Sequence, residues 1–372
     1  MKRFALLILI ALFCLPLSAL ADEPIYLFPE PDGSPGKIHP LSLEDLNPHP
    51  LDTFWYTESY FFIAILDDGH IAYVNLMLSN MGLKKHQPAL TFTIITPELE
   101  RFTTEAEYAP EDIEQTGERF SLRMGENLLE GDSRDMHLKL LHQGLGMDLK
   151  FHGSFAGYKL GEGKVYFGKD RATLFYIDYP APRPHVTGTL TIHDRRLEVQ
   201  GWGYVDHCYY NANTMDFEDV WHNFKFYSDR YSVILTSFTT PERFGGQSVS
   251  LGAILDNEKV LCTTTDVIVI EKDHRLVQDG GKSYPHTLEL DFKCPGLRAK
   301  TCFDSSHVVE KIDVLEKLNK GAATRALKFL INTFITRPFY YRAENQAVVE
   351  LTADGKTEKI SGQAVSEVIF VR

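Results

Sequence analysis

The sequence lacks the short motifs by which most enzyme families are recognised. It has no H-E-x-x-H, C-x-x-C, P-loop or dinucleotide-binding pattern, and the segments at 153–157 and 246–250 both fail the G-x-S-x-G pattern of hydrolases. His207, Cys208 and the acidic residues that follow them match no zinc-binding spacing. The sequence therefore predicts neither a cofactor nor a metal.

Basic residues are also in short supply. The chain has 38 lysines and arginines against 51 aspartates and glutamates, which gives a formal net charge of −13. Binding to a phosphate backbone needs a concentration of basic side chains on one face, and no stripe of them is present in the sequence. We therefore expect no nucleic-acid partner.

Cysteine is scarce, with five residues in 372, one of which, Cys14, lies in the N-terminal leader. The other four, Cys208, Cys262, Cys294 and Cys302, allow three pairings. Cys294 and Cys302 flank a loop-like Pro-Gly-Leu-Arg-Ala-Lys-Thr segment, so we predict a disulfide between them. The alternative is four free thiols that are buried as small apolar groups.

Residues 1–21 have the pattern of a secretory signal peptide. Lys2 and Arg3 precede an apolar stretch, and Ala19-Leu20-Ala21 offers an A-x-A cleavage site. We expect cleavage after Ala21 and a periplasmic or secreted mature protein; an uncleaved anchor is the alternative. Export to an oxidising compartment would permit disulfides.

The rest of the chain is rich in short runs of Val, Ile, Thr and aromatic residues separated by turn signals, a composition typical of strands. Many short strands at even spacing indicate barrels or sandwiches. Residues 22–50 are proline-rich and are expected to form an extended arm. The proline-rich stretch at 179–184 is expected to join two β domains, 51–184 and 185–372.

One segment, from about 308 to 335, has a different periodicity. Apolar residues recur there at helical spacing in two groups separated by Asn319-Lys320-Gly321, and Pro338 ends the pattern. We predict one broken amphipathic helix, or two short ones, that lies on a barrel and closes one end. Contact with a membrane or with a partner is the alternative interpretation.

The densest group of aromatic and polar residues lies at 201–210. In a strand, Trp202, Tyr204 and Asp206 share one face, whereas His207 lies on the other. This alternation argues against an acid–base pair acting on one substrate atom. We expect one of Asp206 and His207 to lie at the base of an apolar pocket and the other to have a structural role; the alternative is that both are structural.

The first half has its own aromatic centre at 55–62. Glu58 is the only charged residue between Phe54 and Leu66. It either lines a cavity and binds a hydroxyl or amide group, or faces water, as glutamates usually do.

An ordered set of motifs then resembles a known family. The set comprises Glu58–Phe62 with the segment 68–80, Trp221-His222-Asn223-Phe224, the F-T-T-P-x-x-F-G segment at 238–245, and Thr336–Tyr341. It is similar to the fungal survival-factor family of lipocalin-like proteins. The G-x-G-Y-x-D-H segment at 201–207 resembles the wider superfamily, which includes carotenoid 1,2-hydratase (hydroxyneurosporene synthase) and fungal Diels–Alderases.

The resemblance implies an all-β fold of two tandem lipocalin-like (calycin) antiparallel β-barrels, with the amphipathic helical insertion in the second. It also implies a hydrophobic ligand, such as a lipid or isoprenoid, and a link to survival of oxidative stress. The superfamily often has a polar amide and Trp-Gly after the Asp-His pair, whereas this chain has Cys208-Tyr209-Tyr210. We expect ligand contacts from ten residues: Glu58, Tyr60, Phe62, Asn75, Trp202, Tyr204, Asp206, His207, Trp221 and Tyr340.

Three functions remain compatible with the sequence. The first is an exported carrier of a hydrophobic molecule, for which transient contact with a membrane is one possible partner interaction. The second is a hydratase or cyclase in which Asp206 or His207 donates a proton to an alkene, which requires a dry pocket around the acid. The third is a structural or partner-docking exoprotein with closed cores.

Overall fold

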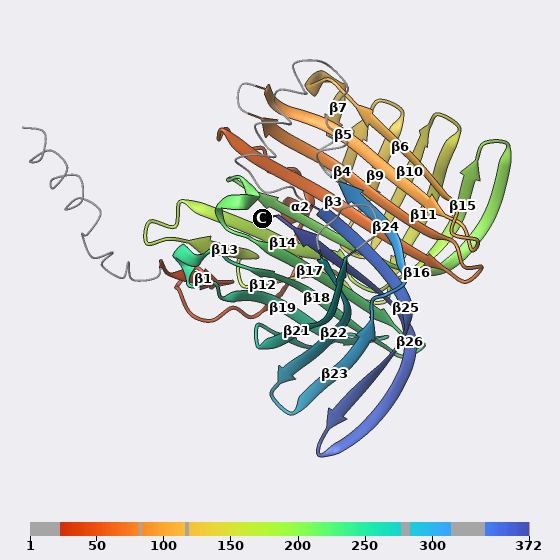
Figure 1. Cartoon of the computed structure of the whole chain (residues 1–372). Coiled ribbons are helices and arrows are strands. Elements are labelled where there is room, and N and C mark those ends of the chain that lie inside the picture. The colour runs from red at the N-terminus through yellow and green to blue at the C-terminus, as the bar shows by residue number, and fades with distance from the viewer. Residues whose placement is uncertain (1–22, 82–83, 116–118, 277–282, 314–338, 372) are drawn as a thin grey trace, which may run out of the picture.

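The structure, a computed structural model, describes residues 23–81, 84–115, 119–276, 283–313 and 339–371. This part of the chain consists almost wholly of antiparallel strands in two large curled sheets (Figure 1). The predicted all-β class is therefore confirmed. The predicted signal peptide lies outside the described residues.

The first sheet has sixteen described strands. In chain order they are β1 (Ile25–Leu27), β2 (Ile38–Pro40), β3 (Trp55–Leu66), β4 (Ile71–Met81), β5 (Lys84–Ile95), β6 (Arg101–Glu107), β7 (Ile113–Gln115), β8 (Phe120–Met124), β9 (Asn127–Gly131), β10 (Asp135–His142), β11 (Leu145–Gly153), β12 (Tyr158–Leu160), β13 (Lys164–Phe167), β14 (Thr173–Ala181), β15 (Pro184–Ile192) and β16 (Arg195–Tyr210).

The second sheet has ten described strands. They are β17 (Val220–Tyr227), β18 (Tyr231–Thr239), β19 (Ser248–Asp256), β20 (Val260–Thr264), β21 (Val267–Leu276), β22 (Ser283–Cys294), β23 (Leu297–Asp304), β24 (Val308–Asp313), β25 (Phe339–Ala353) and β26 (Lys356–Phe370). The described helical turns are short: α2 (Leu43–Leu46), η1 (Pro110–Asp112), η2 (Thr214–Asp216) and η3 (Glu242–Phe244). None of these described helices has the length and apolar character to cross a membrane.

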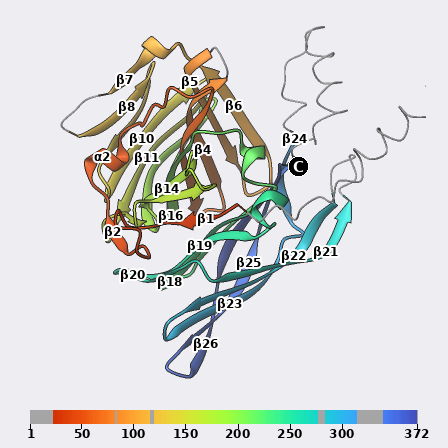
Figure 2. The same ribbon diagram turned by 90° about the vertical axis from the view of Figure 1, so that its left-hand side faces the viewer.

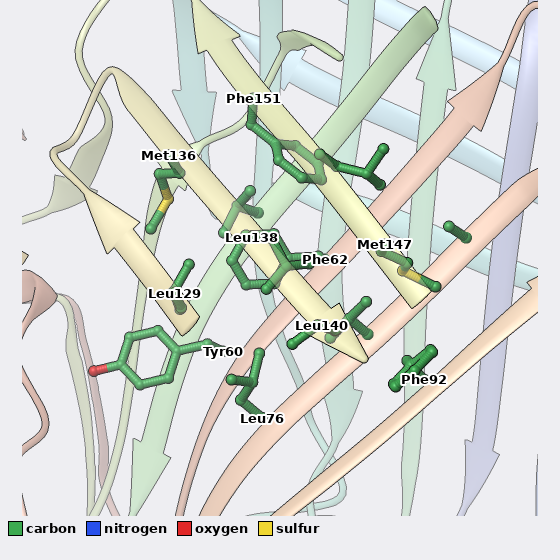
Figure 3. Packing of buried hydrophobic residues seen from close by; sticks show 14 of the residues in the cluster. Tyr60, Phe62, Leu76, Phe92, Leu129, Met136, Leu138, Leu140, Met147 and Phe151 are labelled. Atoms are coloured by element: carbon green, nitrogen blue, oxygen red, sulfur yellow. The ribbon is translucent and has the colours of Figure 1, made fainter. Parts of the chain in front are cut away.

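The first sheet curls around a core of its own. Its strand order is β6-β5-β4-β3-β16-β15-β11-β10-β9-β8-β7, and β14 branches from β16. The curl brings β6 toward β10, where Thr104 Oγ1 lies 2.5 Å from His142 Nδ1. Side chains fill the interior, as Figure 3 shows for Phe62, Leu138 and Phe151. This interior is thus a packed core, in agreement with the density expected of a protein interior.

The second sheet packs beside the first (Figure 2) and also has its own apolar core, around Phe226, Phe292 and Tyr341. A third apolar cluster contains residues of both sheets, among them Ile63 and Tyr204 of the first and Phe238 and Val365 of the second. The two sheets therefore meet through a shared hydrophobic layer.

Strand β3 shows how one sequence serves two of these layers. Its even-numbered residues Tyr60 and Phe62 belong to the core of the first sheet, whereas Ile63 and Ile65 belong to the layer between the sheets. Because successive side chains of a strand point to opposite faces, a strand covered on both sides must be apolar on both. The nearly unbroken apolar run from 59 to 66 has this cause.

The sheets divide later along the chain than the predicted domain boundary at 184/185. β16 pairs with β15 and β14 on one side and with β3 on the other, from Gly201–Leu66 to Tyr210–Thr57. β15 and β16, assigned to the second domain from the sequence, thus belong to the first sheet. The proline-rich stretch forms the end of β14 and the turn into β15, with a register shift between Asp178 and Ala181. Proline is tolerated in a sheet at such irregular positions.

The predicted arm at 22–50 lies against the first sheet. β1 pairs with β13, β2 pairs with β12, and Ser42 caps the single turn of α2 by accepting a hydrogen bond from the backbone N–H of Asp45. The segment after α2 then passes over the end of β3, which places His49 beside Glu58.

Two further predictions need correction. Val308–Asp313, predicted as the start of a helix, is strand β24, paired with β25; the rest of that predicted helix, from 314, lies outside the described residues. The predicted disulfide between Cys294 and Cys302 is wrong, because Cys294 of β22 bonds Cys262 of β20. In the hairpin of β22 and β23, Cys302 is opposite Glu289, which lies five residues before Cys294 on β22. Cys302 is a free, exposed thiol.

Candidate functional site

A cavity of about 590 Å³ lies where the two sheets meet. Its wall on the first sheet is made by the faces of β3, β4, β14 and β16 that point away from the first core. The second sheet and the η2 segment supply the remainder. The lining residues are Thr57, Ser59, Phe61, Asn75, Met77, Ile177, Asp206, Cys208, Tyr210, Asn213, Thr214, Met215, Glu218, Trp221, Asn223, Tyr340, Glu367, Ile369 and Val371.

Several polar atoms in this wall have no hydrogen-bond partner among the residues that the structure describes. They are Trp221 Nε1, a donor, Asn223 Oδ1, an acceptor, and Glu218 Oε2. Buried polar groups are normally paired, so unpaired ones that line a cavity are positions where a bound molecule can supply the partner. Burial raises the pKa of Asp206 to about 7, against the opposing effect of Lys225.

A buried group of charged side chains borders the cavity, and one of them, Glu367, is part of its wall. Glu367 Oε2 accepts hydrogen bonds from Lys225 Nζ at 2.9 Å and from Asn223 Nδ2 at 3.1 Å. Its Oε1 accepts from Arg342 Nε at 3.0 Å and Nη2 at 2.8 Å. Arg342 also pairs with Glu310. We call Lys225, Glu310, Arg342 and Glu367 the interface ion cluster.

The interface ion cluster joins the two sheets. The Arg342 guanidinium lies 3.4 Å from the centre of the Tyr73 ring on β4, and Lys225 Nζ lies 4.7 Å from the centre of the Tyr204 ring on β16. Burial favours the protonated form of Glu367, but Lys225 and Arg342 outweigh burial and lower its pKa to about 2. Both cations are therefore already neutralised by carboxylates of the protein.

A second polar group lies inside the first sheet, on the faces of β3, β14 and β16 that point away from the cavity. His207 Nε2 is 2.7 Å from Glu58 Oε1, and His207 Nδ1 is 3.5 Å from Asp178 Oδ2. The backbone N–H of His49 donates to both oxygens of Glu58, at 2.8 and 2.9 Å. Tyr60 stacks on the imidazole at 4.3 Å between ring centres. We call His49, Glu58, Asp178 and His207 the His207 cluster.

The side chains of Glu58 and His207 are both 0% exposed, so water does not screen the electrostatic interactions between them. Burial alone would lower the pKa of His207, but Asp178 and Glu58 raise it to about 10. Burial alone would raise the pKa of Glu58, but hydrogen bonds from His207 and His49 lower it to about 2. Burial raises the pKa of Asp178. Within the described residues, His49, Glu58 and His207 form the one group of potential metal ligands whose ligand atoms all lie within 4.8 Å of one another.

The structure separates the ten predicted ligand residues. Four of them line the cavity, namely Asn75, Asp206, Trp221 and Tyr340. Glu58, Tyr60 and His207 meet in the His207 cluster, and Phe62 lies in the core of the first sheet. Tyr204 belongs to the layer between the sheets. Trp202 lies beside Arg183, whose guanidinium is 4.2 Å from the centre of the indole ring.

The pair proposed as catalytic is also divided. Asp206 lines the cavity, and His207 lies across the sheet from it with Glu58. The two side chains cannot act on the same substrate atom, which is the consequence of strand alternation anticipated from the sequence.

Some cavity residues were not identified from the sequence. Ser59 and Phe61 alternate with the predicted ligand residues Glu58 and Tyr60 on strand β3. The aromatic segment was therefore recognised, but the prediction took the face of the strand that points away from the cavity. Asn223 lies within the Trp-His-Asn-Phe motif. Glu367 is 142 residues from its partner Lys225, and no local pattern links them.

Known proteins resemble most of the chain. A model of the Svf1 family matches residues 37–372. The ceramide-binding protein SVF1 of Yarrowia lipolytica is 22% identical over 360 residues, which cover 89% of this chain and 90% of the relative. The ceramide-binding protein SVF1 of Candida albicans is 23% identical over 376 residues, which cover 92% of this chain and 95% of the relative.

Solved structures also resemble the fold. CghA in complex with Sch210972 has a TM-score of 0.56 at 10% identity, over 93% of this chain and 98% of that one. Kievitone hydratase from Nectria haematococca has a TM-score of 0.51 at 13% identity, over 93% and 98%. At such identities the likeness concerns the fold alone.

Proposed function

The chain belongs to the Svf1 family, and we propose that it binds and carries a lipid-like molecule in the cavity between its two sheets. The observation on which this depends is the cavity of about 590 Å³ with Trp221 Nε1 and Asn223 Oδ1 unpaired in its wall. A long apolar molecule with a hydroxyl or amide head would cover the apolar wall and pair those atoms. The relatives from Yarrowia lipolytica and Candida albicans are named for binding ceramide, which has such a head.

The charges of the cavity favour an uncharged head. Asp206, Glu218 and Glu367 all line it. The nearby cations Lys225 and Arg342 are already paired with Glu367. A phosphate group would meet carboxyl groups and no free cation among the described lining residues, so phospholipids should bind poorly.

We also propose that the protein acts outside the cytoplasm. The leader pattern at 1–21 and the Cys262–Cys294 disulfide support export to an oxidising compartment. N-terminal sequencing of the mature protein tests this, with Asp22 as the expected first residue.

Lipid extraction of the purified protein, followed by binding of fluorescent ceramide, tests the carrier function. Met77→Trp should lower the affinity at least tenfold by filling the cavity. Val348→Trp, on an exposed face of β25, is the matched control and should bind normally. No lipid in the extract and no ceramide binding would contradict the proposal. Conversion of the bound molecule to a product would instead support the hydratase or cyclase alternative.

A further inference from the structure

The carrier function does not use the His207 cluster, which lies across the first sheet from the cavity. We propose that His49, Glu58 and His207 bind a divalent transition-metal ion, and that zinc is the ion their chemistry suits best. Two histidines and one glutamate are a ligand set that zinc takes in sites that keep one position for water.

The three ligands come from separate segments that the fold brings together. His207 of β16 and Glu58 of β3 are diagonal neighbours across adjacent strands, because His207 is opposite Tyr60 and Glu58 is opposite Tyr209. His49 precedes β3 and is fixed by the two hydrogen bonds from its backbone N–H to Glu58. All three ligand atoms lie within 4.8 Å of one another.

The two spacings that involve Glu58 Oε1 are close to what an ion requires. Ligand atoms of a tetrahedral zinc site, each about 2.0–2.1 Å from the ion, lie roughly 3.3 Å apart. His49 Nδ1 is 3.5 Å from Glu58 Oε1, so that pair already fits. His207 Nε2 and Glu58 Oε1, now 2.7 Å apart, would separate by roughly half an ångström as the ion replaces the hydrogen between them.

An unpaired nitrogen provides a further indication. His49 Nδ1 is buried without a hydrogen-bond partner in the described part of the chain, and the neighbouring His207 side chain is 0% exposed. A ring nitrogen of His49 with no partner, directed at a buried carboxylate, is the arrangement that a cation would complete.

The surrounding groups are those that hold metal ligands in place. Asp178 Oδ2, 3.5 Å from His207 Nδ1, is placed to receive that N–H and leave Nε2 free for the ion. Tyr176 OH donates to Asp178 Oδ2 at 2.6 Å, and Tyr56 OH donates to Glu58. Such partners fix ring orientation and increase ligand basicity.

One of the ligands also borders a groove. A groove of about 570 Å³ on the arm side of the first sheet is lined by His49, Tyr176 and Tyr209, among others. The groove brings solvent to His49, next to the buried Glu58 and His207.

Metal titration of the purified full-length protein tests this inference. After treatment with a chelator, one Zn²⁺ per chain should bind and raise Tm, and one Co²⁺ should give visible absorption bands of histidine coordination. His49→Phe keeps the ring that stacks on Tyr209 and the backbone N–H, but removes Nδ1. It should weaken zinc binding at least tenfold and leave ceramide binding unchanged.

His274→Phe is the matched control. His274 pairs with Glu271, which also contacts His222, but these three residues are not part of the group formed by His49, Glu58 and His207. The zinc affinity of the His274→Phe variant should equal that of the wild type. Absence of binding at micromolar zinc, or equal affinity of His49→Phe and wild type, would overturn the inference. If His49→Phe does not fold, the wild-type protein decides: a Tm that zinc fails to raise also overturns it.

Discussion

The two sides of strands β3 and β16 differ in how the polar groups there are bonded. On the cavity side, Trp221 Nε1 and Asn223 Oδ1 of the facing strand β17 have no hydrogen-bond partner among the described residues. On the other face, Glu58 accepts hydrogen bonds from His49 and Tyr56 and pairs with His207. Neighbouring residues 206 and 207 therefore have different environments. A polar group bonded within the fold contributes to stability whether or not it also binds an ion, whereas one left unpaired beside the cavity is available to the ligand held there.

The largest effect expected from this contrast follows from Glu58→Gln. Removing one partner of a buried ion pair leaves the other charge uncompensated, so we expect a loss of about 3–5 kcal/mol in the free energy of unfolding. Glu218→Gln on the cavity side is the comparison. Burial and Asp219 raise the pKa of Glu218 well above its usual value, and Glu218 Oε2 has no hydrogen-bond partner among the described residues, so the change should cost less than about 1 kcal/mol. Urea unfolding of both variants measures this; equal losses would abolish the contrast.

The opposite orientations of Asp206 and His207 on β16 could be predicted from the sequence, because successive side chains of a strand point to opposite faces. The side on which the ligand cavity lies could not. Glu58, Tyr60 and Phe62 were predicted to contact the ligand, yet Tyr60 and Phe62 face the packed core of the first sheet and Glu58 belongs to the His207 cluster. The cavity forms on the other face only because β17 and β26, far along the chain, pack there.

The start of the helix predicted from about 308 to 335 shows another limit. Val308 and Ile312 are four residues apart, a spacing that fits a helical turn and also one face of a strand. Pairing with β25 decides in favour of the strand, and Arg342 on β25 bonds Glu310. The disulfide was mispredicted for a related reason, since Cys262 reaches Cys294 from a strand 32 residues earlier.

The interface ion cluster gives the next effect, which depends on pH. Lys225 and Arg342 hold the pKa of Glu367 at about 2, below its ordinary value of 4.5. A depressed carboxyl pKa stabilises the fold fully above pH 4.5, and this contribution is lost as the pH falls toward 2. The difference in unfolding free energy between wild type and Glu367→Gln should therefore shrink over that window, by on the order of 3 kcal/mol. A constant difference between about pH 5 and about pH 3 in urea titrations would contradict the assignment.

A smaller effect on binding should distinguish Asp206 from His207. Asp206→Asn keeps the size of the side chain but changes its hydrogen-bonding groups inside the cavity. We expect it to weaken ceramide binding by about 1–3 kcal/mol with little change in Tm. His207→Gln should instead lower Tm, because it removes the cation between Glu58 and Asp178. If neither Tm nor affinity moves in either variant, the pair has been wrongly singled out.

The smallest effect concerns a single N–H group. Trp221→Phe retains an aromatic ring against Phe175 and Phe238 but removes the unpaired indole Nε1 from the cavity wall. One hydrogen bond to a neutral ligand group contributes about 0.5–1.5 kcal/mol, so the ceramide affinity should fall roughly three- to tenfold. Trp202→Phe, beside Arg183 and outside the cavity, is the control and should bind ceramide as the wild type does. Because Nε1 of Trp221 has no hydrogen-bond partner in the described part of the chain, its loss should leave Tm nearly unchanged. A drop in Tm without a change in affinity would mean that Trp221 serves the contact between the sheets and not the ligand.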